Sequence, residues 1–260
     1  MRREHPRVVS LVPSWTETLF SFGLDSLVGV TRFCVHPKEL VERVERVGGT
    51  KDPKVARIAE IAPDLVVCEK EENRREDVEA MRAAGLDVLV TEVKDLATAR
   101  AESMRLAEAV GRAEAGAALV ARLEAAEREA RAGAPPEPLP VYAPIWRNPW
   151  MTPTRDTYAH HALEAAGARN VFADAPGRYP ERSPREAVEA GARWALLPTE
   201  PYPFERFLAD ARAELAAAGL DPARVALLDG EALTWYGARG VEGLHEVARA
   251  VRAAADSARE

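Results

Sequence analysis

The chain has 260 residues, 47% of them hydrophobic, and a net charge of −7. This length allows one large domain or two moderate ones, and the acidic balance excludes a basic nucleic-acid-binding surface. Two cysteines exclude a disulfide framework, and no apolar run reaches the roughly 18 residues of a membrane span. The first residues, MRREHPRVVSLVPSW, lack the apolar stretch of a secretory signal. We therefore expect a cytoplasmic protein, or a periplasmic or cell-surface one if a leader has been removed.

From the N-terminus, short β-rich runs alternate with helical ones. Residues 7–13 (RVVSLVP) are typical of a buried strand, and SWTETLFSFG follows as a helix. The alternation continues with further strands predicted at 27–30, 65–68 and 86–91. Strand–helix alternation predicts a parallel sheet with helices on both faces. Residues 1–94 are therefore expected to form an N-terminal α/β lobe.

Residues 95–133 have a different pattern. They are rich in Ala, Glu, Arg and Leu, they contain no proline, and their apolar residues recur at spacings of three and four. This pattern predicts one long connecting helix, or two helices with a joint near Gly111 or Gly116. The proline-rich stretch GAPPEPLP ends the helical pattern.

Residues 134–260 echo the first series and are expected to form a C-terminal α/β lobe. PVYAPIW occupies the place of RVVSLVP. SPREAVEAGARWALLPTE matches DPKVARIAEIAPDLVVCE in its order of features: a proline at the first turn, a helix, a break, a strand and a glutamate. An internal duplication of this kind indicates two like halves. The predicted fold class is therefore α/β, with two similar parallel-sheet lobes joined by one long backbone helix and a ligand cleft between the lobes.

Aromatic and basic residues gather in the segments that follow the predicted strands. In open parallel sheets, ligands bind beyond the carboxyl ends of the strands. Trp146 and Trp150, in PIWRNPWMTPTRDTY, are explained either by core packing or by a ligand-binding wall, and the arginines beside them favour the wall. The candidate ligand-binding residues are Trp15, Arg32, Phe33, Lys70, Arg147, Trp150, Arg178, Tyr202, Trp235 and Tyr236.

Enzyme signatures are absent from the sequence: it has no G-x-G-x-x-G, Walker loop, H-E-x-x-H or G-x-S-x-G motif. Cys34 and His36 alternate on a predicted extended segment and are candidate metal ligands, although packing explains them as well. His160 and His161 are neighbours in a predicted helix, where side chains diverge by about 100°. We therefore expect these two histidines not to share a metal site.

The order of these segments resembles that of a known family. RVVSLVPSWTETLFSFGLDSLVGVTRFCVHP, then VGGTKDPKVARIAEIAPDLVV, the helical segment and DTYAHHALEAAGARNVFAD are similar to helical-backbone metal-chelate receptors. These are the substrate-binding proteins of ABC importers that bind vitamin B12, haem or ferric siderophores. The likeness is closest to the B12 binders and covers nearly the whole chain. It implies two α/β lobes, a rigid connecting helix and a metal chelate held between the lobes.

The resemblance also implies how the protein would meet a transporter. Importer docking in that family relies on one exposed glutamate at the top of each lobe. The matching positions fall near Arg75 and Arg185, so the candidate docking residues are Glu76 and Glu186, one residue away.

The first hypothesis is therefore a non-enzymatic, monomeric binding protein for a metal chelate. A corrinoid is the first choice of ligand, and haem or a ferric siderophore comes next; an ABC-importer permease is the expected partner, and no intrinsic cofactor is expected. A direct axial ligand to the chelated metal would be His36 or Cys34. One alternative is a cytoplasmic enzyme that uses Glu71 or Glu72 as general base in the interlobe cleft. The other is a cytoplasmic interaction protein whose aromatic loops form a partner surface.

Overall fold

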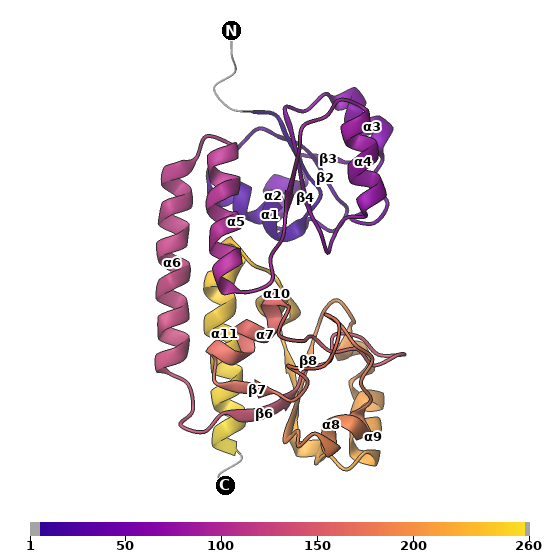
Figure 1. Cartoon of the computed structure of the whole chain (residues 1–260), viewed down its shortest axis with the longest axis vertical. Coiled ribbons are helices and arrows are strands. Elements are labelled where there is room, and N and C mark those ends of the chain that lie inside the picture. The colour runs from indigo at the N-terminus through magenta and orange to yellow at the C-terminus, as the bar shows by residue number, and fades with distance from the viewer. Residues whose placement is uncertain (1–5, 258–260) are drawn as a thin grey trace. The chain divides into compact units, whose positions relative to one another are not determined.

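The computed structural model describes residues 6–257, which divide into two compact units (Figure 1). The first lobe consists of the residues up to Val93 together with Ala97–Ala121 and Tyr236–Arg239. The second lobe consists of Lys94–Leu96, Arg122–Trp235 and the residues from Gly240 onward. The helical segment after residue 95 therefore belongs partly to one lobe and partly to the other.

A five-stranded parallel sheet forms the centre of the first lobe, with strand order β3-β2-β1-β4-β5. Its strands are β1 (Val8–Ser10), β2 (Leu27–Val30), β3 (Glu45–Arg46), β4 (Leu65–Glu69) and β5 (Val88–Thr91). Every residue of β1 and β4 is buried. Central strands of a parallel sheet are apolar along their whole length because helices cover both faces, which is why these two strands read as continuous apolar runs.

Helices cover the first sheet on both sides. Those that lie between its strands are α1 (Pro13–Ser21), α2 (Lys38–Val41), α3 (Val55–Ile61) and α4 (Arg75–Ala83). Ile58 of α3 and Met81 of α4 pack on the sheet residues Val9, Val66 and Cys68. In Figure 1, α3 and α4 lie together on one side of the sheet and α5 lies on the other.

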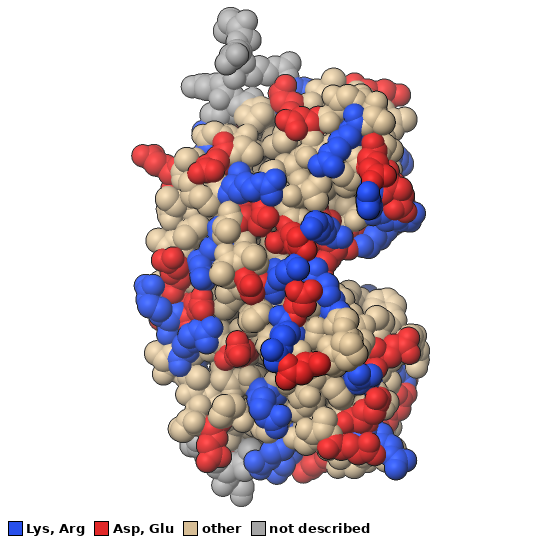
Figure 2. All heavy atoms as spheres, in the orientation of Figure 1, with Lys and Arg blue, Asp and Glu red and all other residues tan. Residues whose placement is uncertain are grey.

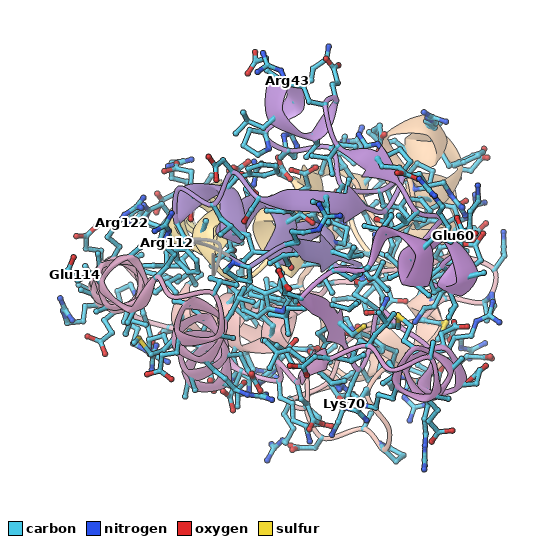
Figure 3. The ribbon with its side chains drawn as sticks, turned by 90° about the horizontal axis from the view of Figure 1, so that it is seen from above. Arg43, Glu60, Lys70, Arg112, Glu114 and Arg122 are labelled. Atoms are coloured by element: carbon cyan, nitrogen blue, oxygen red, sulfur yellow. The ribbon has the colours of Figure 1, made fainter. Side chains whose placement is uncertain are left out.

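The segment predicted as one long helix, or as two with a joint near Gly111 or Gly116, consists of two helices, α5 (Leu96–Ala109) and α6 (Ala113–Ala132). Gly111 forms the joint with a φ of 70°, a left-handed conformation that glycine adopts without steric cost. Gly116 has another role: a Cβ added there would lie 2.4 Å from the Cβ of Ala107, so α6 packs closely against α5. Figure 3 shows the two helices end-on and side by side. The long backbone helix is therefore the 20-residue α6 alone.

The second lobe repeats the topology of the first. Its parallel sheet has the order β7-β6-β8-β9, which corresponds to β2-β1-β4-β5. The strands are β6 (Leu139–Tyr142), β7 (Ala168–Asn170), β8 (Trp194–Pro198) and β9 (Val225–Leu228). The predicted fold class of two similar parallel-sheet α/β lobes is confirmed.

The helices of the second lobe also cover both faces of its sheet. They are α7 (Tyr158–Ala165), α8 (Pro184–Glu189), η1 (Phe204–Phe207), α9 (Leu208–Ala217), η2 (Pro222–Arg224), α10 (Gly230–Thr234) and α11 (Ala238–Ser257). Ala187 of α8 and Leu215 of α9 share a core with Ala195 and Leu197 of β8. Within residues 6–257, none of the helices combines the length and the apolar character that crossing a membrane requires.

Candidate functional site

The loops beyond the carboxyl ends of the strands form the candidate site in each lobe, as expected for open parallel sheets. We call the segments that follow the strands of the first lobe (residues 11–15, 31–37, 70–74 and 92–93, including the start of α1) the first-lobe face. We call the segments that follow the strands of the second lobe (residues 143–157, 171–183, 199–207 and 229–235, including η1 and α10) the second-lobe face. Each face is described by itself.

Two aromatic residues predicted to contact a ligand are core residues of the first lobe. Trp15 is fully buried, and its indole Nε1 donates a hydrogen bond of 2.8 Å to Thr91 Oγ1. Its ring centroid lies 4.7 Å from that of Tyr236, which is also buried. A buried indole whose N–H has a partner is well satisfied inside a core. The prediction that Trp15 and Tyr236 contact a ligand is therefore corrected by their burial.

Phe33 is the aromatic residue that the first-lobe face exposes. Its side chain is 48% exposed, and the guanidinium carbon of Arg32 lies 4.8 Å from the centre of its ring. Arg32 also makes two hydrogen bonds, of 3.0 and 3.1 Å, to the carboxylate of Asp52. Lys70 forms an ion pair with Glu92. Both predicted cations of this face therefore already have a carboxylate partner.

A buried carboxylate that the sequence interpretation missed organises the loop after β4. Glu69 accepts hydrogen bonds from the backbone N–H groups of Glu71, Glu72 and Val93. Asn73 accepts from the Glu69 N–H at 2.9 Å and so closes the same loop. Burial, followed by the Glu69 carboxylate, raises the pKa of Glu72. The available signal was a charged residue directly after a buried apolar run.

Cys34 and His36 do not form the predicted pair of metal ligands. The Cys34 sulfur is fully buried, 3.1 Å from Thr16 Oγ1 and 3.2 Å from Thr31 Oγ1, and burial raises the pKa of the thiol. A thiol must lose its proton to bind a metal, so Cys34 is a structural residue. Among the described residues, these two side chains have no third His, Cys, Asp or Glu with which to complete a site. His36 is half-buried, and its role as an axial ligand stays a prediction.

In the second lobe, Trp150 and Arg147 both donate hydrogen bonds to Glu214 of α9. Trp150 stacks on Phe204 with ring centroids 5.7 Å apart, and its Nε1 donates to Glu214 Oε2 at 2.8 Å. Arg147 donates from Nε to the other oxygen of Glu214 at 3.2 Å, and its side chain is only 11% exposed. Trp150 is therefore part of the core and Arg147 is neutralised within the fold, which corrects the prediction that they form a ligand wall and an anion clamp.

The second-lobe face exposes a different set of rings. Trp146 is 41% exposed and packs edge-on against Tyr202, with centroids 5.5 Å apart. Tyr202 in turn contacts Phe207, which is also 41% exposed, at 5.5 Å. We call Trp146, Tyr202 and Phe207 the aromatic cluster. Tyr202 was among the predicted site residues, whereas Phe207 was missed because it follows the loop, within η1.

Trp235 and Arg178 also have partners within the second lobe. Trp235 is buried, and its Nε1 donates a hydrogen bond of 2.6 Å to Glu200 Oε1. Burial, and secondly the neighbouring Glu231, raise the pKa of Glu200 to about 7. Arg178 Nε lies 3.8 Å from Asp156 Oδ2.

Figure 2 shows that charges of both signs are intermixed over the surface in view.

The two candidate docking glutamates occupy different positions in their lobes. Glu76 is exposed in the first turn of α4, between β4 and β5. Glu186 lies on α8, before β8, and its carboxylate accepts hydrogen bonds from the backbone N–H and the hydroxyl of Ser183 in a capping box. The counterpart of α4 in the second lobe is η1 with α9, between β8 and β9, where Glu205 is an exposed acidic residue in the first turn of η1.

Two parallel-sheet lobes of one topology, each with its loops gathered at the strand ends, define a two-lobe binding protein. The chain matches the family described as "Periplasmic binding protein" over residues 8–197, and it belongs to that family.

Known relatives agree with this assignment. The chain is 26% identical to the vitamin B12-binding protein of Salmonella paratyphi A over 76% of its own length and 77% of that protein. It is also 26% identical to the uncharacterized ABC transporter substrate-binding lipoprotein YvrC of Bacillus subtilis, over 96% of this chain and 81% of the relative. Among solved structures, the apo periplasmic heme-binding protein RhuT of Roseiflexus sp. RS-1 is similar, with a TM-score of 0.84, 25% identity, and 96% and 98% coverage of the two chains.

These relatives decide two of the expectations drawn from the sequence. The expected cytoplasmic location is wrong, because the family is periplasmic and one relative is described as a lipoprotein. The first residues of the chain therefore did not reveal where the protein works. The relatives are binding proteins rather than enzymes, which confirms the expectation of a non-enzymatic protein and makes a general base at Glu71 or Glu72 unnecessary.

Proposed function

We propose that this chain is the substrate-binding protein of an ABC importer, and that its ligand is a metal chelate with a broad apolar face. A corrinoid such as vitamin B12 is the first choice, and haem or a ferric siderophore comes next. The similarity to B12-binding and heme-binding proteins supports the ligand class. The observation that carries the proposal is the exposed aromatic cluster at the strand ends of the second lobe.

The aromatic cluster is suited to a flat ligand. Exposed aromatic surface that is held in place is typical of a binding site, and aromatic rings stack well on a planar apolar surface. Trp146 rests on Tyr202, and Tyr202 rests on the buried Phe204, 4.7 Å away. The rings are therefore ordered before the ligand arrives, which lowers the entropy lost on binding.

The charge arrangement favours a corrinoid over haem. Haem carries two carboxylates, which are best met by cations without a partner in the protein. Arg32, Lys70 and Arg147 each already pair with a carboxylate of this chain. The amide groups around a corrin ring are neutral, so they do not need a cation. Neutral hydrogen-bond donors and acceptors in the first-lobe face can bind them.

The direct test is titration of the protein with cobalamin, cobinamide, haem and a ferric siderophore, followed by ligand absorbance and tryptophan fluorescence. We expect saturable binding to one chelate at micromolar or lower Kd, weakened roughly tenfold by Trp146→Ala and by Phe207→Ala. Leu227→Ala is the control, because it removes exposed apolar surface from within strand β9 and outside the aromatic cluster. Absence of saturable binding to all four chelates would refute the proposed ligand class.

Engagement of an importer permease is proposed through Glu76 and Glu205. These residues lie in equivalent helical connections of the two lobes, and both are exposed. With the cognate permease in proteoliposomes, Glu76→Arg and Glu205→Arg should each reduce chelate uptake without changing chelate affinity. Glu186→Arg serves as the comparison, and a larger loss for it than for Glu205→Arg would return the docking role to Glu186. The purified binding protein and its variants, without the permease, should elute as monomers in size-exclusion chromatography.

A further inference from the structure

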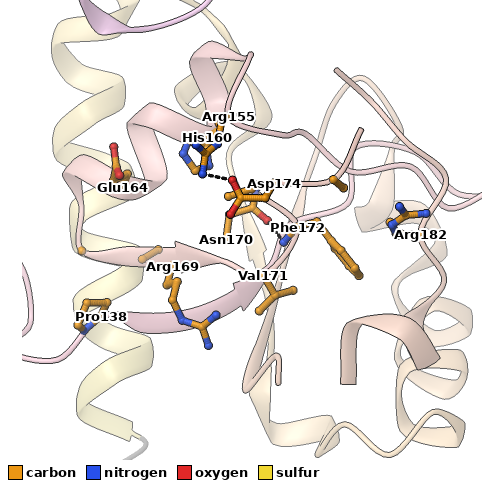
Figure 4. Close-up of a pocket in the computed structure, with 14 residues that line it drawn as sticks. Pro138, Arg155, His160, Glu164, Arg169, Asn170, Val171, Phe172, Asp174 and Arg182 are labelled. Carbon is orange, nitrogen blue, oxygen red and sulfur yellow. Dashed lines mark hydrogen bonds and ion pairs between the residues drawn. The ribbon is translucent and has the colours of Figure 1, made fainter. Parts of the chain in front are cut away.

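The second lobe contains a pocket that the aromatic cluster does not line. It has a volume of about 590 Å³ and lies along the edge strand β7 and helix α7. Figure 4 shows His160 and Glu164 of α7 on one side of this pocket and Asp174 facing them. The residues of α7 are held in place from the helix start, where the Thr157 hydroxyl accepts a hydrogen bond from the His160 backbone N–H.

His160 is buried and lacks a partner for one ring nitrogen. Its side chain is only 7% exposed, and Nδ1 has no hydrogen-bond partner among the described residues. Leaving a buried polar atom without a partner is costly, so such atoms need a specific explanation. In a neutral imidazole, one ring nitrogen carries a lone pair that can bind a metal ion.

His161 and Glu164 lie beside His160 and offer two further possible ligand atoms. His161 Nε2 lies 2.9 Å from the carbonyl oxygen of Arg155. Since a carbonyl only accepts, Nε2 carries a hydrogen, which leaves Nδ1 as the nitrogen able to bind a metal ion. That Nδ1 lies 3.5 Å from Glu164 Oε2. A hydrogen bond from the distal ring nitrogen to a carbonyl is the usual way in which a metal-binding histidine is oriented.

The three side chains are close enough to share one ion. A ligand atom of each lies within 4.8 Å of those of the other two, and the two imidazole centroids are 4.9 Å apart. The expectation that neighbouring helical histidines point apart is therefore wrong here, because their rings turn toward each other beyond Cβ. Two ligands at 2.0–2.1 Å from a tetrahedral zinc ion lie roughly 3.4 Å apart, which agrees with the separation of His161 Nδ1 and Glu164 Oε2.

We propose that His160, His161 and Glu164 bind a divalent transition-metal ion such as Zn²⁺, separate from the chelate. Two imidazoles and one carboxylate form a three-ligand zinc set, which leaves a fourth position for water or a small anion from the pocket. An ion pair of protonated His161 with Glu164 would explain those two residues, but it leaves His160 Nδ1 without a partner. Arg155, a cation that lines the same pocket, is paired with Asp174.

The test uses the full chain without a histidine tag, freed of metal by a chelator. Calorimetric titration with Zn²⁺, and visible absorption on titration with Co²⁺, should show one ion bound per chain. We expect His161→Gln and Glu164→Gln, both at accessible positions, to weaken Zn²⁺ binding at least tenfold, and His160→Gln to do the same. Circular dichroism checks that each variant is folded. Zn²⁺ should raise the Tm of the unaltered protein but not that of Glu164→Gln.

A second His–Glu pair supplies the matched control. His245 Nε2 lies 3.0 Å from Glu129 Oε2 on other helices of the same lobe. His245→Gln should leave Zn²⁺ affinity unchanged. No saturable binding, or equal losses in His245→Gln and Glu164→Gln, would overturn the proposal. Chelate affinity should be the same in Glu164→Gln as in the unaltered protein, so failure of this metal site and failure of the chelate proposal are distinguishable.

Discussion

The two lobes share one strand order but use the ends of their strands differently. At the first-lobe face, Trp15 and Tyr236 pack inward, and Phe33 is the ring left exposed. At the second-lobe face, Trp150 packs inward whereas Trp146 stays 41% exposed. The duplication has therefore preserved where the loops lie, while the side chains on those loops have taken different roles. Each aromatic residue at a strand end has to be judged by its own contacts.

The sharpest way to break this comparison is to truncate one tryptophan in each lobe. Trp15→Ala should lower the free energy of unfolding by about 3–5 kcal/mol, because it opens a large cavity and leaves Thr91 without its donor. Trp146→Ala should lower it by less than about 1 kcal/mol, because much of that side chain is already in water. Urea denaturation followed by circular dichroism measures both values.

Trp15→Phe is the control for the first variant, since it keeps most of the ring volume and loses the hydrogen bond. Its loss of stability should lie between those of the other two variants. Equal losses for Trp15→Ala and Trp146→Ala would mean that the two lobes bury their strand-end tryptophans alike.

The fold was largely predictable from the sequence because it depends on local patterns. Continuous apolar runs and helical spacing identified the strands and the duplication. What the pattern left open was the role of single glycines: Gly111 is the joint between α5 and α6, whereas Gly116 permits their close packing. Both glycines lie in the same kind of helical sequence, and only the contact with Ala107 distinguishes them.

The sequence places the candidate site at the level of loops but does not identify which of their residues are exposed. Trp146 and Trp150 lie four positions apart in one loop, and nothing local separates the exposed ring from the buried one. The difference comes from Glu214, 64 residues beyond Trp150, whose carboxylate accepts from Trp150 Nε1. The same distant carboxylate neutralises Arg147. Such long-range partners leave no trace in the spacing of residues.

A second comparison concerns two glutamates in equivalent places, Glu69 at the end of β4 and Glu200 just after β8. Glu69 is held by backbone N–H groups, whereas Glu200 accepts from Trp235 and Thr234 and has a pKa raised to about 7. An unfolded glutamate has a pKa of about 4.3. Between these two values the folded state holds a proton that the unfolded state has lost, so stability falls as pH rises from about 4.3 to 7 and stays lower above 7.

Glu200→Gln should remove this loss, since glutamine does not titrate and still accepts from Trp235. The stability of Glu200→Gln relative to the unaltered protein should therefore rise by about 2 kcal/mol between pH 5 and pH 8. Glu69→Gln should instead be destabilising at both pH values, because its amide nitrogen would face backbone donors. Urea titrations at the two pH values measure both effects. A pH-independent difference for Glu200→Gln would show that Glu200 is ionised in the folded state.

The smallest expected changes in stability come from removing the carboxylate of an arginine–carboxylate pair, one pair in each lobe. Glu214→Ala removes the acceptor of the buried Trp150 N–H and the nearer carboxylate partner of Arg147, whose side chain is 11% exposed. It should cost on the order of 1 kcal/mol. Asp52→Ala releases Arg32 into water, where exposed pairs contribute little, so its denaturation midpoint should not change. Because Arg147 and Trp146 share a loop, Glu214→Ala should also weaken chelate binding. Unchanged stability and affinity in Glu214→Ala would mean that the aromatic cluster holds its place without α9.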